Sequence, residues 1–227
     1  MASSSTDIAN YALAKLGSKR IQDINDSNSK GARLALLHYD QARKSLLRRH
    51  RWNFATLRAA LTQDADAPAW GYKYQYAVPA DFIRLMVVNN QDVWESGRAD
   101  WFELEGSDTG RRILINSESV RIKYVGDVNN TNHFDDLFIE ALSLFLAAKM
   151  ARAMTGSDRK EQLLLEELEG TVLPDAMQTN ASEAHSGENP PVIDAIQNSY
   201  LVRARGSRHA DEWPEGPDGG TYGLPTA

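Results

Sequence analysis

The chain of 227 residues contains no cysteine, and this absence excludes disulfide bonds and thiolate nucleophiles. The N-terminal sequence MASSSTDIANYALAKLG lacks the basic segment and the continuous apolar run of a signal peptide, so we expect no export signal. Leu137–Ala151 is the most apolar run, with 12 apolar residues of 15, but it is short for a membrane span and contains Glu140 and Lys149. We therefore expect a helix buried in protein and no membrane contact.

Signatures of catalysis are also missing. There is no G-x-S-x-G nucleophile elbow and no phosphate-binding loop, and the Gly-rich GPDGGTYG at the end lacks a strand–turn–helix context. The histidines show no metal-ligand spacing: His38, His50, His133, His185 and His209. We expect no metal, no cofactor and no enzymatic activity.

Charge is unevenly distributed along the chain. The net charge of −6 argues against nucleic-acid binding by the whole surface. Between Lys30 and Arg58 there are eight Lys or Arg and one acid, Asp40, whereas the segment from Ala181 onward has seven acids and three Arg. This asymmetry suits complementary contacts between copies of the chain or with a partner.

Apolar periodicity and capping residues predict helices in the first and last thirds of the structured part. The expected helices run from Ser5 or Thr6 to Gly17, from Ser29 to about His50, from Asp135 to about Met154, and from Ser157 to about Ala176 with a bend near Gly170 and Pro174.

The middle of the chain has the pattern of β structure. Tyr72, Tyr74, Tyr76 and Val78 alternate with polar residues and are expected to share one face of a strand that packs on a hydrophobic layer. The candidate strands are Tyr72–Val78, Phe82–Val88, Trp101–Leu104, Arg112–Ile115 and Val120–Val125. The predicted fold is α+β: a helical bundle from residues 1–66 and 128–180, an inserted antiparallel β module of residues 67–127, and an extended C-terminal arm of residues 181–227.

The predicted arm holds six of the 15 glycines and five of the 8 prolines. Pro190 and Pro191 favour an extended backbone, and the residues after them offer apolar and cationic anchors for a partner. The candidate anchors are Val192, Ile193, Ile196, Tyr200, Leu201, Arg203 and Arg205.

Three charged groups have both a functional and an ordinary interpretation. Glu103 and Glu105 could serve as acid and base in a glycosidase, or be solvated acids on a strand. The arginines that precede Trp52 could hold a phosphate backbone, or extend along the apolar end of a helix. Glu161, Glu166 and Glu167 could line a negative channel in a ring, or form a solvated helix face.

The order of several segments resembles one protein family. ARLALLHYDQARKSLL, HRWNFATLRAAL, WGYKYQYAVPADFIRLMVV, DVNNTNHFDDLFIEALSLFLAAKMARAMTGS and SYLVRAR are similar to segments of the head-to-tail adaptor proteins of short-tailed bacteriophages, also called tail tubular protein A or tail accessory factors. The resemblance covers nearly residues 7–205. Arg51 departs from it, because a proline is expected before the Trp-Asn-Phe triplet, and the chain after Gly206 is not covered.

The resemblance implies a virion protein with a helical bundle and a β module. Such adaptors form a ring, typically of twelve copies, between the portal and the next tail protein (a nozzle or tail tube). The ring extends the DNA channel, where it touches the viral DNA transiently and without sequence specificity. The arm reaches the portal or a neighbouring subunit, and assembly takes place in the host cytoplasm.

Two other functions remain open from the residues. One is a particle-associated glycosidase that degrades the cell wall with a pair of carboxylates. The other is a DNA-binding accessory protein that uses the basic face between Lys30 and Arg58.

Overall fold

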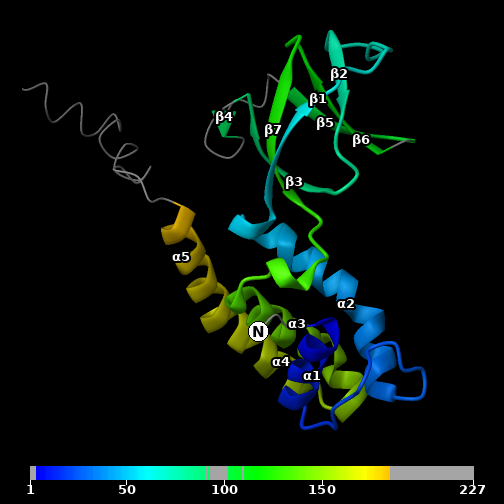
Figure 1. Cartoon of the computed structure of the whole chain (residues 1–227), viewed down its shortest axis with the longest axis vertical. Helices are drawn as coiled ribbons and strands as arrows, with labels where there is room; N and C mark the ends of the chain where they lie inside the picture. The colour runs from blue at the N-terminus through cyan, green and yellow to red at the C-terminus, as the bar shows by residue number, and fades with distance from the viewer. Residues whose placement is uncertain (1–3, 90, 93–101, 109, 185–227) are drawn as a thin grey trace, which may run out of the picture. The chain divides into compact units, whose positions relative to one another are not determined.

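The structure is a computed structural model that describes residues 4–89, 91–92, 102–108 and 110–184. These residues belong to one compact unit that ends at Ala184. The predicted α+β class is confirmed: helices from both ends of this unit enclose one core, and two antiparallel sheets lie between them in sequence (Figure 1). All of the predicted arm beyond Ala184 lies outside the described residues, and residues 181–184 continue a helix.

The bundle consists of helices whose predicted positions are largely confirmed. They are α1 (Ser5–Lys15), α2 (Lys30–Arg49), α3 (Asp136–Thr155), α4 (Asp158–Glu167), the π-helical segment η4 (Leu168–Val172) and α5 (Leu173–Ala184). Ser29, Asp135 and Ser157 accept backbone hydrogen bonds as N-caps of α2, α3 and α4. The first cap is Ser4 rather than Ser5 or Thr6, because Ser4 and Asp7 form a reciprocal capping box.

The last helical stretch continues past the predicted end at Ala176 to Ala184, and it contains a π-helical turn near the predicted bend at Gly170 and Pro174. Pro174 has no backbone N–H and would crowd the carbonyl four residues earlier in a regular α-helix. The wide π turn of η4 comes directly before this proline and contains Gly170, so the chain accommodates the proline and continues as α5.

The bundle core is centred on α3, which is buried on nearly every side. Trp52 is 1% exposed and donates from its indole nitrogen to the carbonyl of Leu46 at 3.1 Å. Its ring meets Phe138 at 5.0 Å between centroids, and Phe54 meets the same ring at 4.9 Å. The expectation that Trp52 and Phe54 lie in or beside the bundle core is therefore confirmed.

The β module begins earlier than predicted. After the short 3-10 turn η1 (Asn53–Ala55), Thr56–Leu61 forms strand β1, although the predicted boundary put this segment with the bundle. β1 pairs antiparallel with β7 (Val120–Gly126), so the strands that leave and re-enter the bundle lie side by side. The intervening strands are β2 (Tyr74–Ala77), β3 (Phe82–Val88), β4 (Gln91–Asp92), β5 (Phe102–Ser107) and β6 (Gly110–Ile115).

Two sheets, ordered β1-β7-β3-β4 and β2-β6-β5, enclose a second hydrophobic core. Ile122 and Tyr124 of the first sheet and Tyr76 and Ile113 of the second all contribute to it. The predicted tyrosine face is confirmed for Tyr74, Tyr76 and Val78, which pack in this core. Tyr72 differs, because it precedes β2 and lines a hollow on the outer face of the second sheet.

Candidate interaction surfaces

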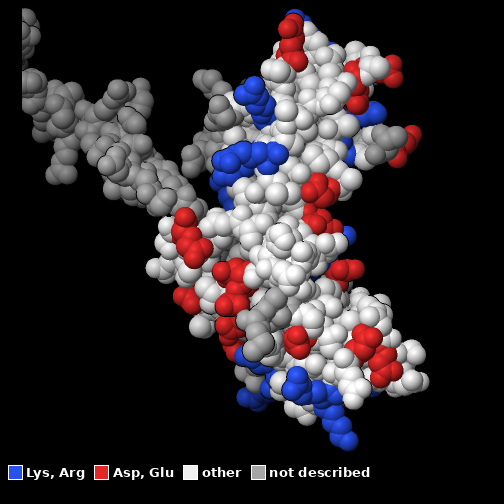
Figure 2. Space-filling model, viewed as in Figure 1, with Lys and Arg blue, Asp and Glu red and all other residues white. Residues whose placement is uncertain are grey.

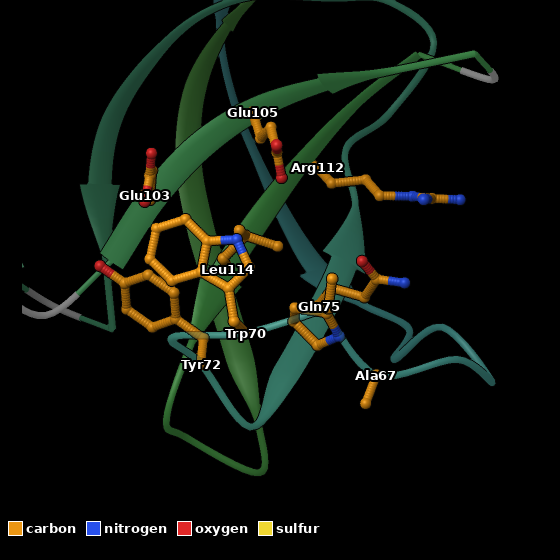
Figure 3. Close-up of a pocket in the computed structure, with 10 residues that line it drawn as sticks. Ala67, Trp70, Tyr72, Gln75, Glu103, Glu105, Arg112 and Leu114 are labelled. Atoms are coloured by element: carbon orange, nitrogen blue, oxygen red, sulfur yellow. The ribbon is translucent and has the colours of Figure 1, made fainter.

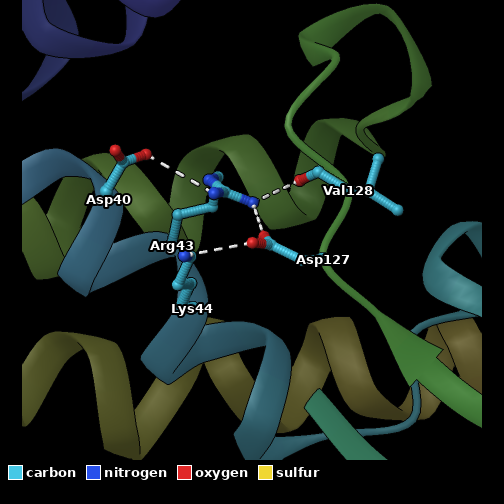
Figure 4. A network of polar contacts seen from close by, with 5 residues as sticks. All are labelled: Asp40, Arg43, Lys44, Asp127 and Val128. Atoms are coloured by element: carbon cyan, nitrogen blue, oxygen red, sulfur yellow. Dashed lines mark hydrogen bonds and ion pairs between the residues drawn. The ribbon is translucent and has the colours of Figure 1, made fainter. Parts of the chain in front are cut away.

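A buried arginine joins the bundle to the end of the β module. Arg43 of α2 is 3% exposed, and its guanidinium forms an ion pair with Asp127 and donates to the carbonyl of Val128 at 2.6 Å. Lys44 reaches the same carboxylate at 3.1 Å, and Asp40 approaches Arg43 at 3.4 Å (Figure 4). Burial alone would raise the pKa of Asp127, but the hydrogen bonds and charges of Arg43 and Lys44 lower it below its ordinary value.

The arginines at the end of α2 are likewise engaged within the molecule. Arg48 donates to the carbonyl of Ile83 at 2.8 Å, and Arg84 of β3 donates to the carbonyl of Arg48 at 2.9 Å and to that of Arg49 at 3.2 Å. The two bonds from Arg84 satisfy carbonyls at the C-terminal end of α2, which the helix itself leaves without partners. Arg49 also pairs with Glu169 at 3.2 Å and lies over the ring of Phe145. Arg43, Arg48 and Arg49 therefore make contacts within the molecule, as the helix-end interpretation of this segment expects.

Asn180 of α5 holds the segment that links α2 to β1. Its side-chain amide donates to the carbonyl of Arg51 at 2.8 Å and lies 3.0 Å from Nε2 of His50, while its side-chain oxygen accepts from the backbone N–H of Asn53 at 2.8 Å. Burial, followed by the charges of Arg84 and Arg51, lowers the pKa of His50. A neutral His50 can accept the Asn180 hydrogen bond.

The three candidate channel residues lie on α4 but have different environments. Glu166 and Glu167 are exposed and Glu161 is half-buried. Glu167 forms an ion pair with Lys15 of α1 at 3.0 Å, so part of its charge is already neutralised. Figure 2 shows acidic side chains gathered along the α4–α5 stretch. Whether this face borders a channel stays a prediction.

The seven candidate arm anchors, from Val192 to Arg205, lie outside the described residues. Other apolar side chains are exposed on the bundle, namely Tyr11, Leu36, Leu37 and Leu163. Tyr11 borders a hollow of about 590 Å³ between α1 and α3, whose walls include Ala14, Ile139 and Ser143. Exposed apolar groups of this kind are typical of protein contacts, although single ones are common on any surface.

An acidic aromatic hollow of about 300 Å³ lies on the outer face of the three-stranded sheet. We use the name aromatic hollow for the site lined by Trp70, Tyr72, Glu103 and Glu105, together with Gln75, Arg112 and Leu114. Figure 3 shows the Trp70 and Tyr72 rings next to each other, below the two carboxylates of β5 in this view.

The loop between β1 and β2 covers part of this sheet and is fixed to it. Gln75 donates to the carbonyl of Asp66 at 2.9 Å, and Arg112 pairs with Asp64 at 2.8 Å. This loop carries Trp70, whose side chain is 84% exposed. Because Asp64 neutralises the charge of Arg112, the carboxylates of Glu103 and Glu105 give the aromatic hollow a net negative charge.

A basic face lies on the outer side of the four-stranded sheet. We use this name for Arg58 of β1 and Arg121 and Lys123 of β7, which border a shallow hollow of about 550 Å³. The register pairs Arg58 with Lys123 and Ala60 with Arg121, so the three cations share one side. None of them forms an ion pair with another residue in the part of the chain that the structure describes. Figure 2 shows basic side chains gathered on one side of the β module in this view.

Sequence reasoning missed these two surfaces as sites. The alternation of Arg121 and Lys123 with apolar residues was visible as a half-solvated strand, but Arg58 joins them only through pairing with β7. Trp70 stood beside the tyrosine run, and the signal that distinguishes it is a large aromatic residue in a Pro- and Gly-containing loop. Glu103 and Glu105 were candidates, and the structure brings both to one hollow.

No protein-family model matches the chain, and no curated protein matches it. Among the described helices, none is long and apolar enough to cross a membrane. Within the same residues there is also no cluster of three or more His, Asp or Glu side chains that could hold a metal ion.

Proposed function

We propose that the chain is a structural, non-enzymatic subunit of a head-to-tail adaptor ring in a short-tailed bacteriophage. In this role it joins the portal to the next tail protein and extends the DNA channel. The observation that supports the proposal most directly is the order of the elements. A helical bundle is interrupted by a β module, as the sequence resemblance implies, and the first and last strands of this module pair with each other.

The bundle and the β module are also joined in a way that suits a load-bearing component. Arg43 and Asp127 connect α2 to the exit of β7. Arg48 of α2 donates to the carbonyl of Ile83, and Arg84 of β3 donates to the carbonyl of Arg48. Val125 of β7 is fully buried in the bundle core. A subunit of this kind can transmit contacts made by its β module to its helices without a flexible linker.

Mixing the purified chain with the portal protein of the same virus tests the proposal. We expect a ring complex, with about twelve copies per portal implied by the resemblance, visible by electron microscopy and as a mass increase in native mass spectrometry. The free chain can be monomeric, because a segment that orders on binding contributes its contacts only with its partner present. The absence of both a ring and a mass increase contradicts the proposal.

Truncation of the arm tests which segment contacts the portal. A chain ending at Ser186 keeps the described bundle and β module, so its melting temperature should match that of the full chain. Portal co-sedimentation should be greatly weakened, because each copy in the ring loses one contact and the losses multiply. Replacing Tyr200, Arg203 and Arg205 together by alanine should reproduce much of the loss. Full binding by the truncated chain would assign the arm to a neighbouring subunit or a later tail component.

The glycosidase remains a second candidate because Glu103 and Glu105 line one hollow beside exposed aromatic rings. Turnover of purified cell-wall glycan, abolished by Glu103→Gln or Glu105→Gln, would favour it. For the DNA-binding alternative, which would use the residues between Lys30 and Arg58, the side chains of Arg43, Arg48 and Arg49 are engaged inside the molecule. A steep fall of DNA affinity with salt concentration would nevertheless support it.

A further inference from the structure

We propose that the β module carries both halves of a head-to-tail contact between copies of this chain, in which the basic face of one copy docks on the aromatic hollow of the next. This inference rests on the proposed ring and names the surfaces that would close it. It requires that the two surfaces lie on opposite sides of the module, that their charges are complementary, and that one of them offers an apolar anchor.

The two surfaces do lie on opposite sides of the module. Alternate residues of a strand point to opposite faces of its sheet. In β7, Ile122 and Tyr124 point into the core between the sheets, so Arg121 and Lys123 point outward. In β5, Phe102 packs against the same core, so Glu103 and Glu105 point outward from the second sheet. The core therefore separates the basic face from the aromatic hollow.

The charges of the basic face favour an anionic partner. Arg58 and Lys123 are directly opposite each other on adjacent strands, and like charges in this position destabilise a sheet. Carboxylates from another molecule would relieve this repulsion. The aromatic hollow offers two of them, Glu103 and Glu105, which the strand repeat spaces at about 7 Å on one face. The cations Arg121 and Lys123 have the same spacing, so the two rows are opposite in charge and equal in period.

The aromatic hollow also supplies an apolar anchor. The indole of Trp70 is 84% exposed, although burying such a ring is among the larger gains available to a protein surface. A guanidinium or ammonium group over Trp70 or Tyr72 gains cation–π attraction in addition to the ion pair with a carboxylate. An exposed Trp and a half-buried Tyr with adjacent acids therefore fit an Arg- and Lys-bearing surface better than an uncharged one. Such residues commonly dominate the binding energy of protein contacts.

Contacts between two different surfaces have a definite consequence for assembly. Each copy then has one basic face and one aromatic hollow to offer, so every bound copy leaves a further surface free. Such head-to-tail contacts give a closed ring when the rotation between copies closes. A contact of one surface with its own counterpart would instead stop at a dimer.

Cross-linking of single-cysteine variants tests the inference, because the natural chain has no cysteine to interfere. Ala60→Cys marks the basic face and Ala67→Cys marks the aromatic hollow; both alanines are exposed and border their surfaces. One variant is uniformly labelled with the heavy isotope of nitrogen, because the two variants otherwise have the same mass. The two variants are mixed in equal amounts and treated with a bis-maleimide reagent, and the dimers are sorted by mass. Random encounters give mixed and like dimers in the ratio 2:1:1. We expect mixed dimers to exceed each like dimer by about twentyfold or more, a tenfold enrichment over the random ratio that is equivalent to about 1.4 kcal/mol.

Matched variants test the residues. Replacing Arg121 and Lys123 by Gln on the Ala60→Cys chain should return the dimers to the random ratio, as should Trp70→Ala on the Ala67→Cys chain. Replacing Lys19 and Arg20 by Gln removes the same charge from an exposed loop of the bundle and should change nothing. Raising the salt concentration to 1 M should also reduce the excess, because the Debye length falls to about 3 Å.

The measurement is made on the chain alone and again on the chain bound to the portal. A random ratio in both overturns the inference. If a ring nevertheless forms on the portal, the proposed function stands and its interface lies elsewhere. If mixed dimers dominate but no portal ring forms, the head-to-tail contact is retained and the adaptor function fails. An excess of like dimers would show a symmetric contact and would also overturn the inference.

Discussion

The bundle and the β module use their charged residues differently. In the bundle, charges join elements of the same chain: Lys15 pairs with Glu167, Arg49 pairs with Glu169, and Arg43 is buried beside Asp127. In the β module, three cations border one outer hollow and form no ion pair within the described residues, and two carboxylates of the other outer face lie beside Trp70 and Tyr72. Charges are thus balanced locally in the bundle and segregated in the β module.

This difference assigns stability mainly to the bundle and recognition mainly to the β module. The bundle core is the larger of the two and surrounds a helix that is apolar on nearly every side. The β core is smaller, and its sheets leave two outer faces largely in solvent. Substitutions in the bundle should therefore change the free energy of unfolding, whereas substitutions on the outer faces of the β module should change binding.

The largest expected effect contrasts two tryptophans. Trp52→Ala removes a ring that is 1% exposed and should lower the free energy of unfolding by about 3–5 kcal/mol. Trp70→Ala removes a ring that is 84% exposed and should change it by less than about 0.5 kcal/mol. Urea denaturation followed by circular dichroism measures both. Comparable losses for the two variants would break the distinction between the regions.

The next largest effect is expected at the contact between α2 and the end of β7. Asp127→Asn removes a charged partner of buried Arg43 and should cost about 1.5–3 kcal/mol, whereas Asp40→Asn, at a carboxylate that is 78% exposed, should cost less than about 1 kcal/mol. Because the pKa of Asp127 is lowered in the folded state, its contribution is present above the unfolded value near 3.9 and is lost as pH falls through the folded value. The acid-induced loss of stability should therefore be smaller in Asp127→Asn. An identical pH dependence in variant and natural chain contradicts this assignment.

A smaller effect follows from His50. Burial lowers its pKa, so the unfolded chain binds a proton more readily than the folded chain. Stability is full above the unfolded value of about 6.5 and should fall as pH decreases below it. His38, whose pKa is lowered by burial and by Lys149, acts in the same direction. His50→Gln keeps a hydrogen-bond acceptor for Asn180 and should flatten the curve between pH 7 and 5, measured by thermal melting. A curve of unchanged slope would show that His50 does not contribute.

The smallest effect is expected at the surface of the bundle. Lys15 and Glu167 form an ion pair whose side chains are 36% and 45% exposed. Glu167→Gln should change the free energy of unfolding by at most about 1 kcal/mol, and 1 M salt should remove most of that difference. Glu166→Gln on the same helix is the matched control. A loss above 2 kcal/mol would mean that surface charge, and not only the core, holds the bundle together.

The sequence by itself determined the helices and most strands, because their signals are local. Ser29, Asp135 and Ser157 act as caps, and Gly156 ends α3 with φ of 70°, a conformation that glycine adopts without strain. Phe82–Val88 was predicted with the observed bounds, since its apolar residues follow one another in sequence and Pro79 marks the turn before them. The burial of Trp52 was likewise expected from the aromatic Trp-Asn-Phe segment that follows the second helix.

Only the tertiary structure decided the identity of β1 and of the two candidate surfaces. Thr56–Leu61 contains several good helix formers, and it becomes a strand because it pairs with β7, about 60 residues later in the chain. The same pairing brings Arg58 beside Lys123, and the loop fixed by Gln75 and Arg112 carries Trp70 to the face of Glu103. Caps and periodicity operate within a few residues, whereas strand register is set by contacts between distant segments. A surface assembled across strands therefore leaves no local pattern in the sequence.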